Sequence, residues 1–302
     1  MTQPVHIPVL LNEVLTALSP APGQIILDGT LGGGGHTAAL ARRVGPNGLV
    51  LGMDRDLAAI DRTEPILKAE GLPVRLAHAN YRDFPEAMRM LNLTHLDGAL
   101  LDLGLSSDQL ADHSRGFSFD AEGDLDLRFD VSEGVPAWVL LNRWSAEEMA
   151  DVIFRYGEER ASRRIARAIV QRREEQPIRR ASELAEICRR CLPSSHGLRH
   201  RIDPATRTFQ ALRIAVNGEL QALDDFLKCI DDWLAPNGKV AIISFHSLED
   251  RMVKNHFRDS NKLDVVTRKP IEASEEEWER NPRSRSAKLR LAVRREEKGY
   301  ES

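Results

Sequence analysis

The 302-residue chain is long enough for about two domains, and its 42% hydrophobic residues can fill ordinary buried cores. No apolar run approaches the roughly 18 residues of a membrane helix, and no signal-peptide pattern opens the chain, so membrane-spanning and secreted classes are excluded and a cytoplasmic location is expected. A net charge of −4 does not mark the whole chain as a nucleic-acid binder.

The most informative motif is an apolar run that ends in an acid and is followed by four consecutive glycines. Ile25 to Leu27 suit a buried parallel strand, and Gly32 to Gly35 allow backbone N–H groups to approach a ligand closely. A helical pattern follows over His36 to Val44, and its N-terminal dipole would face that ligand. The motif predicts a nucleotide-cofactor loop, with a plain Gly-rich turn between strand and helix as the alternative.

The next two strand-like runs also end in acids, at Asp54 and at Asp102. Asp54 follows Gly35 by nineteen residues, which is the spacing at which an acidic side chain binds ribose hydroxyls in open α/β folds. Together with Asp28 at the end of the first run, three strand ends point carboxylates toward one crevice. Asp54 taken alone could instead be the helix N-cap of the segment after Asp56.

The glycines do not name the cofactor, because Gly33, Gly35 and Ala38 also fit the loose dinucleotide pattern G-x-G-x-x-A. A dinucleotide would present a pyrophosphate, and no basic supplement to such a site is evident nearby. S-adenosylmethionine has no phosphates and carries a sulfonium cation, so the acids at the strand ends favour it. A nicotinamide-dependent oxidoreductase remains the alternative enzyme class.

The whole chain resembles the ribosomal RNA small subunit methyltransferase H family, bacterial enzymes that use S-adenosylmethionine to methylate N4 of a cytidine in 16S ribosomal RNA. The resemblance rests on ordered motifs from end to end: His6-x-Pro-Val-Leu-Leu11, Asp28-Gly-Thr-Leu-Gly-Gly-Gly-Gly-His36, Asp54-Arg-Asp56, Asp102-Leu-Gly-Leu-Ser-Ser-Asp-Gln-Leu110, Arg115-Gly-Phe-Ser-Phe119, Tyr156-Gly-Glu-Glu-Arg160, Arg164-Ile-Ala-Arg-Ala-Ile169, Thr206-Arg-Thr-Phe-Gln-Ala-Leu-Arg213, Ile243-Ser-Phe-His-Ser-Leu-Glu-Asp-Arg251 and Asn281-Pro-Arg-Ser-Arg-Ser286.

The resemblance implies a Rossmann-like class I methyltransferase sheet with an inserted all-helical domain, acting on a cytidine in the decoding region of 16S rRNA. The residues that it assigns to the cofactor are Gly34, Gly35 and His36 from the loop, Asp54 at the ribose, Tyr81 beside the adenine, and Asp102 with Gln109 at the sulfonium. Tyr81 stands where the family often has Phe, and it keeps the aromatic face. Asp108 replaces a frequent Pro, which leaves the local loop conformation less defined.

Helical spacing predicts where the inserted domain lies. A capping box over Ser145 to Glu148 opens a helix that Gly157 ends. A second helix ends before Pro177, and a third spans Ala181 to Leu192. We therefore expect 1–107 to be the first, cofactor-binding part of the methyltransferase domain, 108–215 to be a helical domain for RNA or substrate recognition, and 216–302 to be the second part. In that last part we expect strands over 239–245, 263–267 and 288–293, and we expect the acidic stretch 272–279 to be a loop or short helix.

Charge in the helical region points to an RNA partner. Residues 151–215 hold fifteen Arg and no Lys against eight Asp or Glu, and Arg suits both phosphate contacts and stacking on bases. Ion pairing along solvated helices is the alternative. The expected partner is 16S rRNA, within the small ribosomal subunit, with no membrane; a homodimer is left open. A non-catalytic RNA-binding ribosome-assembly factor and a DNA cytosine-N4 methyltransferase are the rival functions.

The expected chemistry centres on Asp102. The lone pair of a cytosine amine is delocalised into the ring, so a positioned acceptor is needed to make N4 nucleophilic, and Asp102 is the candidate catalytic residue. His246 is a candidate partner for the departing proton, and a structural histidine is the alternative. Cys188 and Cys191 have no second pair and Cys229 stands alone, so neither a disulfide framework nor a metal site is expected.

Overall fold

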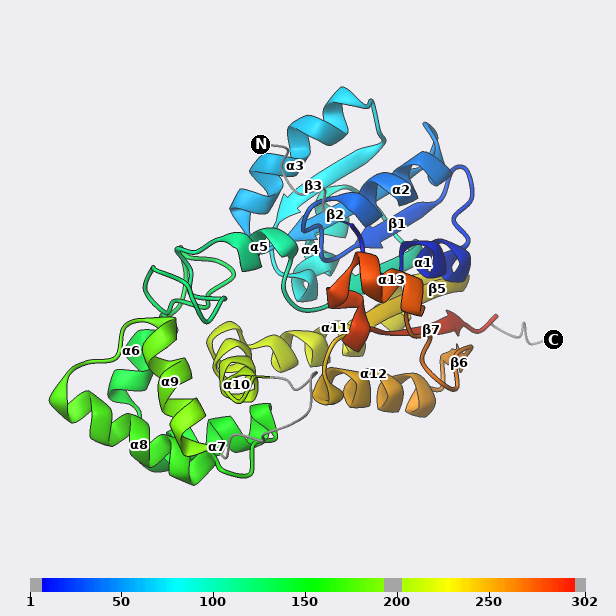
Figure 1. Cartoon of the computed structure of the whole chain (residues 1–302). Helices are drawn as coiled ribbons and strands as arrows, with labels where there is room; N and C mark the ends of the chain where they lie inside the picture. Colours follow the sequence, from blue (N-terminus) through cyan, green and yellow to red (C-terminus); the bar gives the residue numbers. More distant parts are fainter. Residues whose placement is uncertain (1–6, 193–202, 297–302) are drawn as a thin grey trace. The chain divides into compact units, whose positions relative to one another are not determined.

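The chain is described by a computed structural model over residues 7–192 and 203–296, which leaves His6 of the first motif outside the described residues (Figure 1). Two compact units form. One joins the residues up to Ser106 with those from Leu220 onward, and we call it the sheet unit; the other, Ser107–Glu219, is the helical unit. Within the described ranges, no helix is both long and apolar enough to cross a membrane.

The sheet unit is built on seven strands in the order β3-β2-β1-β4-β5-β7-β6. The strands are β1 (Ile25–Asp28), β2 (Leu49–Asp54), β3 (Val74–His78), β4 (Leu96–Asp102), β5 (Leu234–Ser244), β6 (Leu263–Val265) and β7 (Lys288–Arg294). Strands β1 to β5 pair in parallel, whereas β7 lies antiparallel between β5 and β6. The strand order reverses between β1 and β4, which places a topological switch point there. This is the predicted Rossmann-like class I methyltransferase sheet.

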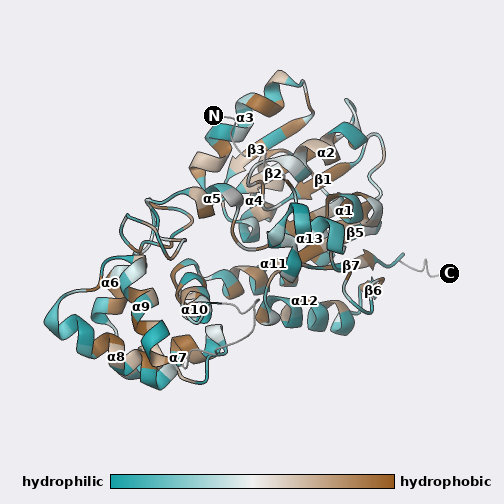
Figure 2. Ribbon diagram, viewed as in Figure 1, coloured by the Kyte–Doolittle hydropathy of each residue, from teal (hydrophilic) through white to brown (hydrophobic). Residues whose placement is uncertain are grey.

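Both faces of this sheet are buried, and successive strand residues divide between them. Ile26 packs with one hydrophobic cluster and the adjacent Leu27 with the other, as do Leu100 and Leu101 on β4. Alternation of this kind follows from the pleat, and burial on both faces explains why the strands read as nearly continuous apolar runs. Figure 2 shows hydrophobic colour along these strands.

Helices cover the two faces of the sheet. The helices of this unit are α1 (Leu11–Leu18), α2 (Gly35–Val44), α3 (Leu57–Ala69), α4 (Phe84–Met90), α11 (Glu219–Trp233), α12 (Ser247–Asp259) and α13 (Glu275–Arg280), with the 3-10 turns η1 (Tyr81–Asp83) and η2 (Pro282–Ser286). Helices α1 and α2 contribute to the cluster around Ile26, whereas α4, α11 and α12 contribute to the cluster around Leu27. The carboxyl edge of the parallel strands is therefore framed by helix ends and connecting loops.

The helical unit consists of short amphipathic helices. They are α5 (Ser107–Ala111), α6 (Ala137–Arg143), α7 (Ala146–Gly157), α8 (Ser162–Glu175), α9 (Ala181–Cys191) and α10 (Thr206–Asn217). The predicted capping box is confirmed: Ser145 Oγ accepts from the Glu148 N–H at 3.1 Å, and the Glu148 carboxylate accepts from the Ser145 N–H at 2.8 Å. Helical spacing in the sequence continues from about Pro204 through Leu212 and Leu223 to Trp233. The structure divides this stretch into two helices, because Gly218 adopts a left-handed conformation at φ 60° and ends α10.

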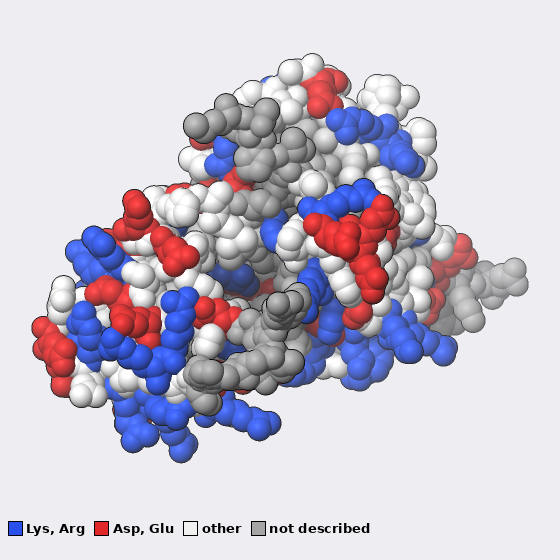
Figure 3. Space-filling model, in the orientation of Figure 1, with Lys and Arg blue, Asp and Glu red and all other residues white. Residues whose placement is uncertain are grey.

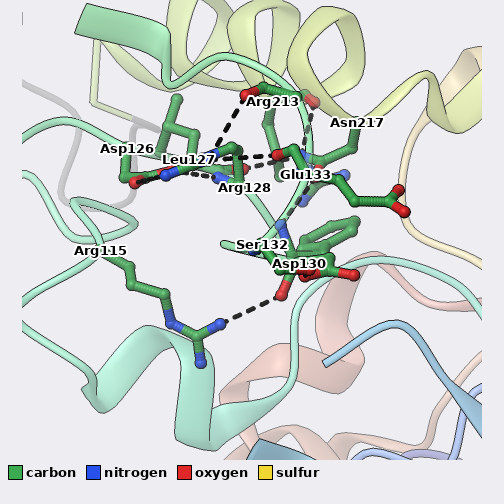
Figure 4. A network of polar contacts seen from close by, with 11 residues as sticks. Arg115, Asp126, Leu127, Arg128, Asp130, Ser132, Glu133, Arg213 and Asn217 are labelled. Carbon is green, nitrogen blue, oxygen red and sulfur yellow. Dashed lines mark hydrogen bonds and ion pairs between the residues drawn. The ribbon is translucent and has the colours of Figure 1, made fainter. Parts of the chain in front are cut away.

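An irregular segment before α6 is held by a polar network inside the helical unit (Figure 4). Asn217, at the end of α10, donates from Nδ2 to the Leu127 carbonyl at 2.7 Å and to the Arg213 carbonyl at 2.9 Å. Its Oδ1 accepts from the Phe129 N–H at 2.8 Å. A single buried side chain thus satisfies the Leu127 carbonyl and the Phe129 N–H, which belong to no helix or strand.

Candidate cofactor and catalytic site

Three acids close neighbouring strands at the same edge of the sheet. Asp28, Asp54 and Asp102 are the last residues of β1, β2 and β4, and β1 pairs in parallel with each of the other two. Asp28 is 1% exposed. Burial raises the pKa of all three carboxyl groups, that of Asp54 and that of Asp102 to about 6. A carboxylate desolvated in this way is stabilised by a nearby cation, so this edge attracts positive charge.

The glycine loop is shaped by contacts that leave no space for side chains. A Cβ at Gly34 would lie 2.3 Å from Thr63 Cγ2, and the residue has φ +75°; a Cβ at Gly35 would lie 2.3 Å from Pro8 Cγ. The Thr63 hydroxyl donates to the Gly32 carbonyl at 3.2 Å. Glycine is therefore required at both positions for the backbone to hold this path.

Asp54 organises the loop. Its Oδ2 accepts from the Gly32 N–H at 2.8 Å, and its Oδ1 accepts from the Asp56 N–H at 2.8 Å. The N-cap of α3 is Asp56, whose Oδ1 accepts from the Ala58 N–H at 3.1 Å. The N-cap alternative for Asp54 is thus wrong, and Asp54 is available to a ligand at the strand end.

Asp102 faces an imidazole and keeps one oxygen unsatisfied. His36 Nε2 lies 2.9 Å from the Val9 carbonyl, which can only accept, so the proton resides on Nε2 in the neutral ring. Nδ1 then presents a lone pair toward Asp102 Oδ2 at 3.8 Å. The buried Asp102 Oδ1 has no hydrogen-bond partner in the described part of the chain. A buried acceptor without a donor is costly, and a donor supplied by a ligand would relieve that cost.

Two other predicted cofactor residues lie in different surroundings. Tyr81 opens η1 directly after β3, and its Cβ lies 2.8 Å from where a Cβ on Gly29 would be, so it stands beside the end of β1. Its ring packs edge-on against Phe226 with 5.8 Å between centroids. Gln109 is buried on α5 of the helical unit, and its place at the sulfonium stays a prediction.

His246 has a structural role. It is the N-cap of α12, where its Nδ1 accepts from the Glu249 N–H at 3.4 Å. Nε2 lies 3.1 Å from Glu249 Oε1, and Glu249 Oε2 accepts from the Phe245 N–H at 2.9 Å. These contacts fit the alternative of a structural histidine. The role of His246 as a partner for the departing proton stays a prediction, because its buried Nε2 has no hydrogen-bond partner among the described residues.

The residues present fit a cationic cofactor better than a phosphate-bearing one. Three largely buried carboxyl groups with raised pKa values would repel a pyrophosphate, whereas a sulfonium would stabilise their ionised forms. The roles predicted for a bound cofactor remain predictions: Asp54 would accept from ribose hydroxyls, Tyr81 would face adenine, and the loop around Gly34 would present its backbone. Asp102, with its unpartnered oxygen, would lie at the sulfonium.

The antiparallel β7 in an otherwise parallel sheet, with acids ending β1, β2 and β4, defines a class I methyltransferase. The chain belongs to the MraW methylase family, whose sequence model matches residues 3–295. The resemblance found in the sequence is thus confirmed.

Relatives with curated names agree over nearly the whole chain. Ribosomal RNA small subunit methyltransferase H of Rhodopirellula baltica is 50% identical over 298 residues, covering 96% of this chain and 91% of the relative. The protein of that name from Deinococcus radiodurans is 49% identical over 290 residues, covering 96% and 89%. Among solved structures, a putative rRNA methylase from Clostridium thermocellum covers 96% of this chain and all 100% of its own with 14% identity and a TM-score of 0.46.

Sequence reasoning missed several residues that build the site. Thr30 Oγ1 accepts from the Asp102 N–H at 2.6 Å, and Thr37 Oγ1 donates to Asp28 Oδ2 at 2.6 Å. Arg283 donates to the carbonyl of Leu105, just after β4. Both threonines lie within or beside the glycine motif, so the sequence could have identified their hydroxyls as hydrogen-bond partners of the site. Arg283 lies 178 residues from Leu105, and no local pattern announces that contact.

Proposed function

We propose that this protein transfers a methyl group from S-adenosylmethionine to the exocyclic N4 of a cytidine in the decoding region of 16S ribosomal RNA. The observation that carries the proposal is the buried Oδ1 of Asp102 at the switch point of the sheet. This oxygen has no hydrogen-bond donor in the described part of the chain, so an amine of the substrate can supply one. The names of the relatives support ribosomal RNA of the small subunit as the substrate.

Asp102 has the chemistry that a cytosine amine requires. An N4–H group that donates to Asp102 Oδ1 leaves the nitrogen lone pair less committed to the ring and directs it toward the electrophile. The bound cofactor supplies the methyl group as a sulfonium, which needs no metal to activate it. As positive charge develops on N4, the anionic carboxylate stabilises it more than it stabilises the neutral amine. The proton of that N–H then passes to Asp102 or to water.

Asp102 is held for this task by two backbone contacts. The Thr30 hydroxyl accepts from its N–H at 2.6 Å, and the Leu103 N–H donates to the Ile243 carbonyl at 3.0 Å. A carboxylate fixed before the substrate arrives does not need to reorganise during the reaction. The target cytidine must be unstacked to reach such a site, so single-stranded or partly assembled ribosomal RNA is the expected substrate.

The arginines of α8 are proposed to contact this RNA. Arg163, Arg164 and Arg167 are exposed and make no ion pair with any described residue, in contrast to Arg190, which pairs with Glu186 on α9. The buried side of α8 is formed by Ile165, Ala166 and Ile169, so these cations lie on its outer side. Figure 3 shows Lys and Arg side chains gathered over the helices of this unit, where α7 and α8 lie in Figure 1.

We predict that changing Arg163, Arg164 and Arg167 together to Ala weakens binding of single-stranded 16S fragments and reduces the salt dependence of that binding. Each lost phosphate contact should lower the slope of log affinity against log salt by about 0.7. Binding isotherms at several salt concentrations measure this slope. Arg190→Ala is the matched control, because its charge is already neutralised by Glu186; an equal loss there would contradict the assignment of α8.

The test of the proposed function is transfer of labelled methyl groups to small ribosomal subunits from a strain that lacks the modification. Nucleoside analysis should find the label in N4-methylcytidine. Label in DNA instead would indicate a DNA cytosine-N4 enzyme, and RNA binding without label would indicate an assembly factor. Nicotinamide fluorescence that changes on mixing would favour the oxidoreductase alternative.

A further inference from the structure

The motif Asn281-Pro-Arg-Ser-Arg-Ser286 lies in a fixed part of the sheet unit for which no function has yet been given. It forms η2, directly after α13. Asn281 Nδ2 donates to the Ile7 carbonyl at 3.0 Å, and the buried Ser284 hydroxyl donates to the Asn281 carbonyl at 2.8 Å. Glu277 on α13 accepts from the Leu10 N–H at 2.8 Å. The segment 277–284 is therefore held against the segment that precedes α1.

This segment also fixes the imidazole that faces Asp102. The Val9 carbonyl, between Ile7 and Leu10, lies 2.9 Å from His36 Nε2. Contacts from Asn281 and Glu277 thus hold the backbone that sets the protonated nitrogen of His36. Residues 7–10 and 277–281 are therefore linked to Asp102 through His36.

Arg283 extends from η2 to the loop that leaves Asp102. Its Nη2 donates to the Leu105 carbonyl, three residues after Asp102, and its side chain is partly buried. Arg285, two residues further on, is exposed and has neither an ion pair nor a side-chain hydrogen bond among the described residues. Two arginines of one short turn therefore differ in their surroundings, and only Arg283 is engaged with the catalytic loop.

Both basic and acidic groups surround Asp102, and they come from four elements. Burial raises the pKa of Asp102 most; His36 on α2 and Arg283 on η2 lower it, while Asp28 on β1 and Glu249 on α12 raise it. Arg283 is the one partner of these that stays charged at every working pH. Removing it would leave Asp102 near two other carboxylates, Asp28 and Glu249, without a permanent positive charge to offset them.

We propose that Arg283 is a positioning residue for the reaction: its guanidinium holds the Asp102–Leu105 loop through the Leu105 carbonyl and keeps the Asp102 carboxylate anionic. The inference rests on the proposed function in that it takes Asp102 as the group that binds N4. It assigns a role to the C-terminal motif that differs from RNA contact, for which the exposed Arg285 is better placed.

Three variants separate these roles. Arg283→Met removes the charge and keeps the length of the stem, Arg283→Lys keeps the charge without the fork of donors, and Arg285→Ala removes the exposed neighbour. Two readouts are compared: the pH profile of kcat for methyl transfer, and the titration of the Asp102 carboxyl carbon followed by NMR in the protein alone, assigned with Asp102→Asn. Arg283→Ala serves as a second neutral variant if Arg283→Met does not fold.

In Arg283→Met both the acid limb of kcat and the Asp102 titration should move to higher pH, because the charge of Arg283 lowers the pKa of Asp102. Arg283→Lys should restore most of that shift, and Arg285→Ala should leave both curves at their wild-type positions. An Asp102 titration that does not move in a folded neutral variant overturns the proposal. Because that titration needs no RNA, it decides the role of Arg283 even where wild-type protein methylates no RNA.

Discussion

Asp102→Asn is expected to lower kcat for methyl transfer by about 10²- to 10⁴-fold, the range found when a positioned acid or base is removed. The amide retains the size of the carboxylate but cannot stabilise the positive charge that develops on N4. Its NH₂ group would also present donors where the N4–H group needs an acceptor. Single-turnover methyl transfer to small subunits, measured with saturating cofactor and RNA, isolates this step.

The pH dependence of the wild-type protein tests the same assignment. Burial raises the pKa of Asp102 to about 6, and the reaction needs the anion, so the rate should rise tenfold per unit below pH 6 and level above it. In the protein without ligand, Asp102 of the folded state keeps its proton between pH 3.8, the usual pKa of the group, and about pH 6, whereas the unfolded state has released it. The contribution of Asp102 to stability therefore falls as pH rises through that window.

Because the ionised Asp102 lowers stability at high pH, the thermal stability of Asp102→Asn serves as an internal control for its activity. Above pH 6 the wild-type protein must hold a largely buried carboxylate whose Oδ1 has no described partner, whereas the variant holds a neutral amide. The variant should accordingly unfold at an equal or higher temperature than the wild type at pH 8 while losing activity. Inactivity accompanied by a lower unfolding temperature would instead mean that Asp102 is a structural residue, and full activity would remove it from the mechanism.

Local sequence patterns predict the cofactor edge well because that edge is built from strand ends. Apolar runs that end in Asp28, Asp54 and Asp102 are local signals, and parallel pairing brings their ends to one edge without further information. The run of glycines is a local motif too, although the contacts that exclude side chains at Gly34 and Gly35 come from Thr63 and Pro8, which are distant in sequence. The sheet class and the motifs of the first strands were therefore readable in advance.

Other elements follow from contacts that no local pattern encodes. The edge strand β3 is only partly buried, with Arg75 and His78 exposed, so it lacks the continuous apolar run that marks β1 and β4. The break at Gly218 divides what reads as one amphipathic helix. The contact from Arg283 to Leu105 joins residues 178 positions apart, and only the folded chain makes it visible.

Asn217→Ala is expected to lower the free energy of unfolding of the helical unit by about 3 kcal/mol or more. The side chain is 6% exposed and forms hydrogen bonds with the Leu127 carbonyl, the Arg213 carbonyl and the Phe129 N–H. The Arg213 carbonyl belongs to α10, but the groups of Leu127 and Phe129 have no such regular partner, and each buried group left unsatisfied costs about 1–3 kcal/mol. Urea unfolding followed by circular dichroism measures the loss.

A local readout shows whether the cause is this network. The Phe129 amide should be protected from hydrogen exchange in the wild type and exchange faster in Asn217→Ala, because its acceptor is gone. Asn261→Ala is the matched control: Asn261 is exposed, so its truncation should change stability by less than about 0.5 kcal/mol. If Asn217→Ala unfolded at the wild-type urea concentration with the Phe129 amide still protected, the segment before α6 would be held by its own Asp126–Arg128 ion pair rather than by α10. The expected outcome instead makes Asn217 the residue through which the end of α10 fixes that segment.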